Sequence, residues 1–182
     1  MKRIFTAGIV VIAISALLII INIGKDQNEP KAAENMNIKQ IVYDYSSGGI
    51  IDESASITSQ KLIVTRNDGT EKNYNLPEDE FFVSIAPYVE NTHPCATHSL
   101  TGCRGELAGK ELDVRIENED GEIVKAETIK SHPNGFIDLW LPREQKYHIT
   151  IDYDGKTAES VFSTFEGDNT CISTMQLKEK SA

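Results

Sequence analysis

Sulfur-containing residues are few in this sequence of 182 residues, which holds three cysteines and three methionines. No two cysteines form a C-x-x-C pair, so the motif of a thioredoxin-like redox enzyme is missing. The closely spaced ligand pairs of a zinc finger are missing as well. Lysine and arginine number 18 against 28 acidic residues, which gives a net charge of -10. Because nucleic acid repels an acidic surface, we expect no nucleic-acid partner.

A long apolar run stands at the start of the sequence. Lys2 and Arg3 precede an uncharged stretch from Ile4 to Gly24, close to the roughly 20 residues that span a bilayer. Basic residues before such a run direct the following chain out of the cytoplasm. We therefore predict that residues 1–24 form a signal peptide or an uncleaved membrane anchor. The rest is expected to be extracytoplasmic, in the periplasm or anchored to the outer face of the cytoplasmic membrane.

The residues after the apolar run predict an α+β fold. Residues 25–34 are polar and typical of a linker. Residues 35–90 predict a small α+β unit with a helix from Asn35 to Tyr45, and such a thin unit is expected to pack against a neighbour or a second copy. Residues 91–182 predict a mainly antiparallel β-sandwich, because short alternating strands and glycine turns follow one another at regular spacing. The expected strands cover residues 60–66, 70–76, 81–85, 112–117, 123–129, 136–141, 147–153, 157–165 and 170–177.

Most reactive side chains gather in residues 88–106, a segment whose pattern fits neither a helix nor a strand. His93, Cys95, His98 and Cys103 fall within eleven positions of this segment. Cys171 begins the last expected strand, and a sandwich can bring that position back beside its first strand. Thiolate and imidazole are ligands of soft and borderline metal ions. Three thiolates suit Cu(I), and two thiolates with two imidazoles also satisfy tetrahedral Zn²⁺.

The same cysteines allow two interpretations without a bound metal. Cys103 and Cys171 can form a disulfide in a structural or adhesive β-sandwich, with Cys95 left as a free thiol. The thiols can also belong to an extracytoplasmic thiol oxidoreductase, although the lack of a C-x-x-C motif counts against it. The sequence leaves open whether Glu106 or Met175 touches a metal ion.

The order of the motifs resembles the CueP family of extracytoplasmic copper-binding proteins of bacteria. The resemblance rests on the segments I-A-P-Y at 85–88, H-P-C-A-T-H at 93–98, C-R-G-E at 103–106 and N-T-C at 169–171. It implies that the family's functional cysteines correspond to Cys95, Cys103 and Cys171, and its loop histidines to His93 and His98. It further implies copper binding, with thiols that reduce Cu(II) to Cu(I). A unit for dimerisation in the N-terminal half and a cysteine-bearing unit in the C-terminal half belong to the same resemblance.

The resemblance also implies a role in copper homeostasis, as copper resistance or as copper delivery to a client such as a periplasmic superoxide dismutase. Turnover would need an outside reductant that restores the thiols, so we expect a metal-binding protein first and a thiol-based Cu(II) reductase second. The expected partners are copper ions, a copper-receiving client or a thiol reductant, a second copy of the chain, and the membrane through the first segment.

The charge at the start of the chain generates a test of export. A reporter enzyme that works only outside the cytoplasm, fused after Ala182, should be active because Lys2 and Arg3 precede the apolar run. Removing residues 1–24 should abolish this activity, since nothing then directs the chain outward. Reporter activity in whole cells is the measurement. Activity of a fused reporter that works only in the cytoplasm would contradict the prediction.

Overall fold

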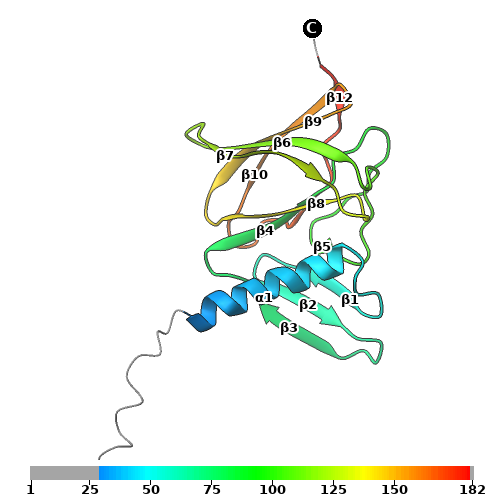
Figure 1. Ribbon diagram of the computed structural model, residues 1–182, viewed down its shortest axis with the longest axis vertical. Coiled ribbons are helices and arrows are strands. Elements are labelled where there is room, and N and C mark those ends of the chain that lie inside the picture. Colours follow the sequence, from blue (N-terminus) through cyan, green and yellow to red (C-terminus); the bar gives the residue numbers. More distant parts are fainter. Residues whose placement is uncertain (1–28, 181–182) are drawn as a thin grey trace, which may run out of the picture. The chain divides into compact units, whose positions relative to one another are not determined.

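The structure is a computed structural model that describes residues 29–180, in which one helix is followed by short strands (Figure 1). The predicted signal peptide or anchor, residues 1–24, lies outside the described residues. Among the residues that are described, no helix is long and apolar enough to cross a membrane. The elements are α1 (Glu29–Ser46), β1 (Ser54–Ile57), β2 (Lys61–Thr65), β3 (Glu71–Asn75), β4 (Glu80–Ile85), β5 (His98–Ser99), β6 (Glu111–Asn118), β7 (Ile123–Lys130), β8 (Ile137–Pro142), β9 (Lys146–Tyr153), β10 (Lys156–Ser163), β11 (Cys171–Ile172) and β12 (Lys178–Glu179).

Helix α1 begins at Glu29, earlier than the expected start at Asn35. Pro30 falls in the first turn, where its missing N–H costs no helical hydrogen bond, and the alanines that follow favour a helix. The helix ends where Gly48 takes a φ of 80°, a conformation that glycine adopts without steric cost. A compact unit of the chain begins at Asn35, within this helix.

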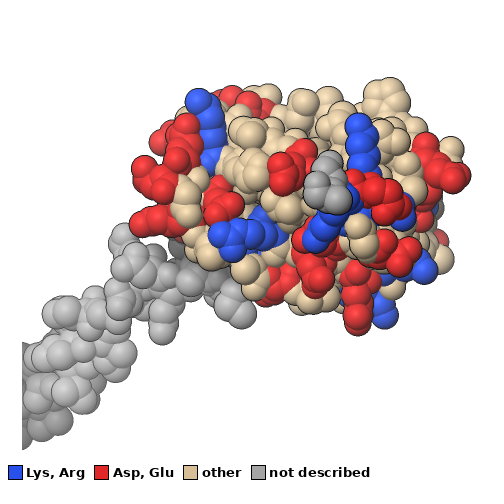
Figure 2. All heavy atoms as spheres, turned by 90° about the horizontal axis from the view of Figure 1, so that it is seen from above, with Lys and Arg blue, Asp and Glu red and all other residues tan. Residues whose placement is uncertain are grey.

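The strands form three sheets, with the orders β3-β2-β1-β5, β12-β10-β9-β6-β7 and β11-β4-β8. All strand pairs are antiparallel except β11 with β4. The predicted α+β class with antiparallel sheets is therefore confirmed. The surface drawn in Figure 2 carries Asp and Glu side chains with Lys and Arg side chains between them, as the net charge of -10 leads one to expect.

The three-stranded sheet is buried on both faces. Phe81, Val83 and Ile85 of β4 point into one apolar cluster, whereas Phe82 points into another. A strand that is covered on both sides lacks the usual alternation, and this explains the nearly continuous apolar run of β4. The sheet β11-β4-β8 is consequently a middle layer between the five-stranded sheet and the layer formed by α1 with β1 and β2.

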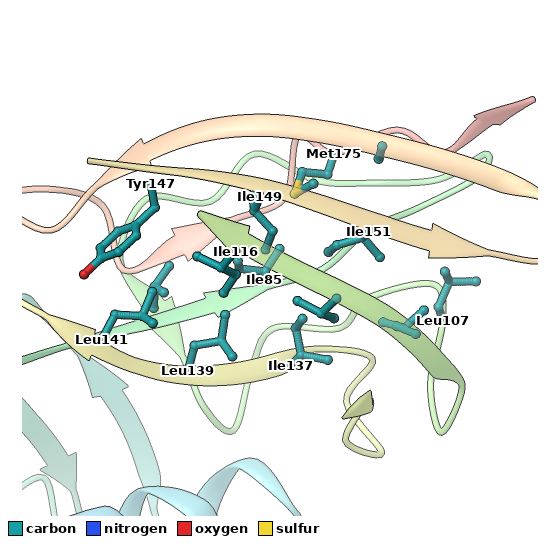
Figure 3. Packing of buried hydrophobic residues seen from close by; sticks show 14 of the residues in the cluster. Ile85, Leu107, Ile116, Ile137, Leu139, Leu141, Tyr147, Ile149, Ile151 and Met175 are labelled. Atoms are coloured by element: carbon teal, nitrogen blue, oxygen red, sulfur yellow. The ribbon is translucent and has the colours of Figure 1, made fainter. Parts of the chain in front are cut away.

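The larger core lies between the middle layer and the five-stranded sheet (Figure 3). Ile137, Leu139 and Leu141 of β8 face Ile149 and Ile151 of β9 across it, and all five are nearly inaccessible. Burying each such side chain contributes about 1.5–3 kcal/mol. Met175, which the sequence left open as a metal ligand, is 2% exposed and packs in this core.

A smaller core joins α1 to the four-stranded sheet. Ile38, Val42 and Tyr45 of the helix pack against apolar residues of β1 and β2, and Phe82 reaches the same cluster from the middle layer. Lys39 adds an ion pair with Glu80. Both cores therefore include residues of β4.

Two details of the expected strand pattern were wrong. The strand expected at 170–177 is much shorter, because only β11 at Cys171–Ile172 forms within it. Residues 173–177 instead cross from the middle layer to β12 at the edge of the five-stranded sheet, and they bury Met175 and Leu177 on the way. The segment 88–106, expected to be irregular, contains the two-residue strand β5, which pairs with β1. The domain division at residue 90 stays a prediction, although β4 before it pairs with β8 after it.

Candidate metal centre

Four predicted ligands come together where the loop of residues 88–106 meets β11. The sulfur atoms of Cys95, Cys103 and Cys171 and a ring nitrogen of His98 all lie within 4.8 Å of one another. The Cys95 and Cys103 sulfur atoms are 3.5 Å apart, and all three cysteines are free thiols. Sulfur and nitrogen atoms at these separations can surround one metal ion after small side-chain movements.

Cys171 is positioned by the parallel pairing of β11 with β4. The Ser84 N–H donates to the Thr170 carbonyl, and the Ala86 N–H donates to the Ile172 carbonyl, both at 2.9 Å. Ile172 packs against the larger core, so alternation along the strand turns Cys171 to the opposite face. This places the last cysteine of the sequence under the loop that carries the other two.

The carboxylate of Glu106 binds the backbone at the beginning of the loop. One of its oxygens accepts hydrogen bonds from the backbone N–H groups of Val89, Glu90 and Asn91, at 2.7, 3.0 and 3.2 Å. Partial burial acts to raise the pKa of Glu106, but the three N–H donors outweigh it and hold this pKa below its ordinary value. The structure therefore gives Glu106 a role in closing the loop.

Two glycines hold the end of the loop against the turn before β8. The Gly105 N–H donates to the Asn134 carbonyl at 2.6 Å. A Cβ atom on Gly105 would lie 2.6 Å from the Gly135 carbonyl oxygen, and Gly135 itself has a φ of 85°. Both positions therefore need glycine, because any side chain would push the segment that follows Cys103 away from the sheet.

His98 is locked into the edge of the four-stranded sheet. It pairs with Ile57 in the register of β5 and β1, and its N–H donates to the Thr170 hydroxyl at 3.1 Å. That hydroxyl donates in turn to the Ile57 carbonyl at 2.6 Å. His98 is 0% exposed, and among the described residues neither of its ring nitrogens has a hydrogen-bond partner. Unpaired buried nitrogens are costly, so their presence fits a metal ligand.

His93 lies just outside this group of four. Its Nε2 atom is buried and likewise finds no hydrogen-bond partner among the residues described. The Ser173 hydroxyl donates to the His93 carbonyl at 2.6 Å and ties this part of the loop to the segment after β11. His93 is thus placed as an auxiliary group beside the thiols.

Phe136 forms an apolar wall of the centre. Its ring centroid lies 4.5 Å from that of His98 and 6.3 Å from that of His93. The same ring belongs to a buried cluster with Ala86 and Cys171, against which the other two cysteines pack. A wall of this kind excludes water and strengthens electrostatic interactions inside.

The thiols differ in their affinity for a proton. The hydrogen bond from Cys171 holds the pKa of Cys103 well below its usual range, and the neighbouring imidazoles of His98 and His93 lower it further. The same bond raises the pKa of Cys171, and burial adds to this effect. Burial also raises the pKa of Cys95. Of the three thiols, Cys103 therefore loses its proton most readily, which suits an incoming cation.

The model of a protein family described as "Periplasmic copper-binding protein CueP" matches residues 45–176. The chain belongs to the CueP family. Its fold is similar to that of "Crystal Structure of S.CueP", with a TM-score of 0.74 and 34% sequence identity over 78% of this chain and 88% of that chain. No curated protein sequence matches. The predicted resemblance to CueP is confirmed, and so is copper as the metal that this family binds.

The CueP assignment agrees with the chemistry of the site. The cluster supplies soft sulfur ligands, which copper prefers, together with imidazole. Sequence reasoning missed Phe136, Thr170 and the paired glycines, because their contacts join segments that are distant along the chain. The only local signal for Gly105 was its place in the C-R-G-E motif.

The carboxylate of Glu106 generates a test that depends on pH. Because folding lowers its pKa, the hydrogen bonds stabilise the fold above the pKa of the unfolded chain, and this stabilisation is lost as pH falls through the lower folded pKa. The difference in unfolding free energy between wild type and Glu106→Gln should therefore shrink at acid pH. Urea titrations between neutral pH and a pH below the ordinary value of 4.5 measure it. A difference that does not change with pH would contradict this role.

Proposed function

We propose that this protein captures copper outside the cytoplasm and holds it as Cu(I). In this proposal Cys95, Cys103, Cys171 and His98 bind the ion, and His93 is an auxiliary ligand. The observation that carries the proposal is the cluster of three sulfur atoms and one unpaired imidazole nitrogen within 4.8 Å, in which Cys171 and His98 are buried and Cys95 and Cys103 are partly buried. Membership of the CueP family supports copper as the metal that the cluster serves.

The donor set favours Cu(I) because this ion is soft and binds sulfur strongly. Three cysteines and one histidine also make a tetrahedral zinc site, so the cluster alone accommodates both metals. The family therefore carries the choice of metal, and the sulfur-rich donor set agrees with it.

The thiols also supply electrons. When two Cu(II) ions meet two thiols, each ion takes one electron, the two sulfur atoms form a disulfide bond, and two protons leave to solvent. In this proposal Cys103 forms the disulfide with Cys171, to which it is hydrogen-bonded. Cys95, whose sulfur atom lies 3.5 Å from that of Cys103, is the remaining thiol. The remaining thiol and the imidazoles then retain Cu(I).

The biological role that we propose is copper resistance or copper delivery at the cell surface. A protein that keeps Cu(I) among several sulfur ligands in a partly buried site limits its reaction elsewhere, and releases it to a partner with suitable ligands. A copper-receiving client and a thiol reductant are the proposed partners. Attachment to the membrane through residues 1–24 and a homodimer formed through residues 35–90 also remain proposals.

The cysteines generate the central test of this function. Reduced protein mixed with Cu(II) should produce Cu(I) and lose two free thiols, as a colorimetric Cu(I) chelator and a thiol titration can measure. Cys103→Ser and Cys171→Ser should each abolish most of the Cu(I) signal, because each removes a partner of the disulfide. Cys95→Ser should mainly weaken retention of Cu(I). An unchanged thiol count in wild type would instead favour a structural disulfide or a thiol without redox function.

The choice of metal generates a second test. In competition with a Cu(I) chelator and a Zn²⁺ chelator of known affinities, the reduced protein should bind Cu(I) far more tightly than Zn²⁺. Removing copper with the Cu(I) chelator should restore all three titratable thiols. Equal occupancy by the two metals at limiting concentration would count against a copper-specific role.

His98 generates a third test, which separates metal binding from folding. Removing a residue that merely hydrogen-bonds to a metal ligand costs about 10–100-fold in metal affinity. His98 is itself a proposed ligand, so His98→Leu should weaken Cu(I) binding by at least that much. The metal-free variant should unfold within about 1 kcal/mol of wild type, because removing two unpaired buried nitrogens offsets the loss of the ring contact with Phe136. The matched control is His148→Leu, because the His148 side chain is 41% exposed on β9 of the five-stranded sheet. This control should change neither the affinity for Cu(I) nor the free energy of unfolding. Chelator competition and urea unfolding measure the two effects, and unchanged Cu(I) affinity in His98→Leu would contradict the ligand assignment.

A further inference from the structure

A groove of about 270 Å³ opens directly beside the metal centre. One wall is the last part of β10, residues 160–163, and the other is the segment 171–174. Cys95 and Cys171 line it as well, and Cys95, which is the more exposed of the two, can be approached from this side. At roughly 30 Å³ for each water molecule, the groove has room for one or two side chains of a visiting molecule.

The backbone edge of β10 is unpaired along this groove. β9 pairs with β10 from Lys156 to Ser163, whereas β12 covers the other edge only at Lys156 and Thr157. Within the described part of the chain, no strand pairs with that edge beyond Thr157. The turn at Asp154 and Gly155, with φ values of 48° and 75°, makes Lys156 and Tyr153 a hydrogen-bonded pair. Alternation along the strand then leaves the N–H and C=O groups of Glu159, Val161 and Ser163 facing outward.

Residues 158–163 of this edge hold no proline and no bulge, and Glu159 is their one charged residue. Val161 is 66% exposed in the middle of it. Asp168 is the one charged residue that lines the groove, and its carboxylate already accepts a hydrogen bond from the Phe165 N–H at 2.8 Å. The groove therefore offers an extended backbone template with an otherwise uncharged lining.

We propose that this groove docks an extended, uncharged segment of a copper-receiving protein that carries a cysteine. The segment pairs with β10 at Glu159, Val161 and Ser163, and its cysteine side chain enters the groove beside Cys95. The free edge selects an extended backbone, because an added strand satisfies its hydrogen-bonding groups. The thiols at the groove select a sulfur ligand, because Cu(I) passes readily between such ligands. The copper part of this inference rests on the proposed function.

The transfer is a ligand exchange without oxidation. In the first exchange the thiol of the visiting cysteine loses a proton as its sulfur bonds to Cu(I), the bond between Cu(I) and Cys95 breaks, and the Cys95 thiolate takes up a proton. The bonds from Cu(I) to Cys103, Cys171 and His98 then break as further donor atoms from the receiving side replace them, and each released thiolate takes up a proton. Copper stays in the Cu(I) state throughout. Strand pairing accelerates the exchange by holding the two sulfur atoms close together.

The first experiment uses a seven-residue probe peptide of alternating threonine and valine with a central cysteine. Cu(I) should pass from the loaded protein to this peptide about tenfold faster than to the same peptide N-methylated on the residues that face β10, because methylation removes the strand-pairing N–H groups. The transfer rate is followed with a dye that is bound to the peptide and released when Cu(I) binds to it. Equal rates for the two peptides would overturn the proposal.

The second experiment changes the protein. Val161→Pro removes the central outward N–H, and proline is tolerated there because that N–H faces away from β9. This variant should transfer Cu(I) to the peptide about five- to tenfold more slowly with unchanged equilibrium affinity for Cu(I), whereas Val161→Thr, which keeps the N–H, should match wild type. Transfer to free cysteine should be the same for all three proteins. A Val161→Pro variant that folds and transfers at the wild-type rate would contradict strand pairing.

A third measurement separates this inference from the proposed function. The peptide with serine in place of cysteine, added to metal-free reduced protein, should slow hydrogen exchange at the amides of Glu159, Val161 and Ser163, whereas the N-methylated form should not. This readout needs no copper, so it stands if the protein fails to bind Cu(I), and it needs no Val161→Pro variant. Unchanged exchange at all three amides would overturn the docking site even if Cu(I) binding is normal.

Discussion

The burial of β4 on both faces is the constraint on which the rest of the structure depends. Its alternate side chains enter two different cores, so this strand connects the layer with α1 to the five-stranded sheet. Its backbone then serves as the template for β11, whose parallel pairing brings Cys171 under the loop. The metal centre is possible because a strand of the middle layer has one face free of the larger core, and the loop of residues 88–106 covers part of that face.

The metal-free centre lowers the stability of the fold. His98 is fully buried with both ring nitrogens unpaired among the described residues, and the lowered pKa of Cys103 favours a negative charge on its sulfur atom. Each unpaired buried polar group costs about 1–3 kcal/mol, and the two cores of the protein must offset this cost in the metal-free state. A bound cation would remove much of it, because it provides a partner for the nitrogen and for the charge. Copper binding is accordingly expected to stabilise the whole unit as well as the loop.

Local sequence patterns were sufficient for much of this fold. The alternation in β9 and the glycine turn after it predicted the strand and its hairpin, since both signals lie within a few residues of each other. The density of cysteine and histidine between His93 and Cys103 pointed to the site in the same way. The early end of β11 at Ile172 was missed, because the path of the following residues depends on where Met175 and Leu177 are buried. The wall formed by Phe136 was missed for the same reason, since nothing near it in the sequence indicates that it meets both histidines.

The position of Cys171 on β11 has a consequence for the order in which the protein is made. Synthesis runs from the N-terminus, so the loop with Cys95, His98 and Cys103 leaves the ribosome long before the strand that completes the centre. A nascent chain that lacks β11 has only two of the three thiols, and it lacks the buried Cys171 of the cluster against which they pack. Copper that met such a chain would find an open, exchangeable pair of sulfur atoms, and the closed centre could form only after nearly every strand was present. Strand β11 therefore completes the site late, and most of the chain must be present before the centre can hold the metal.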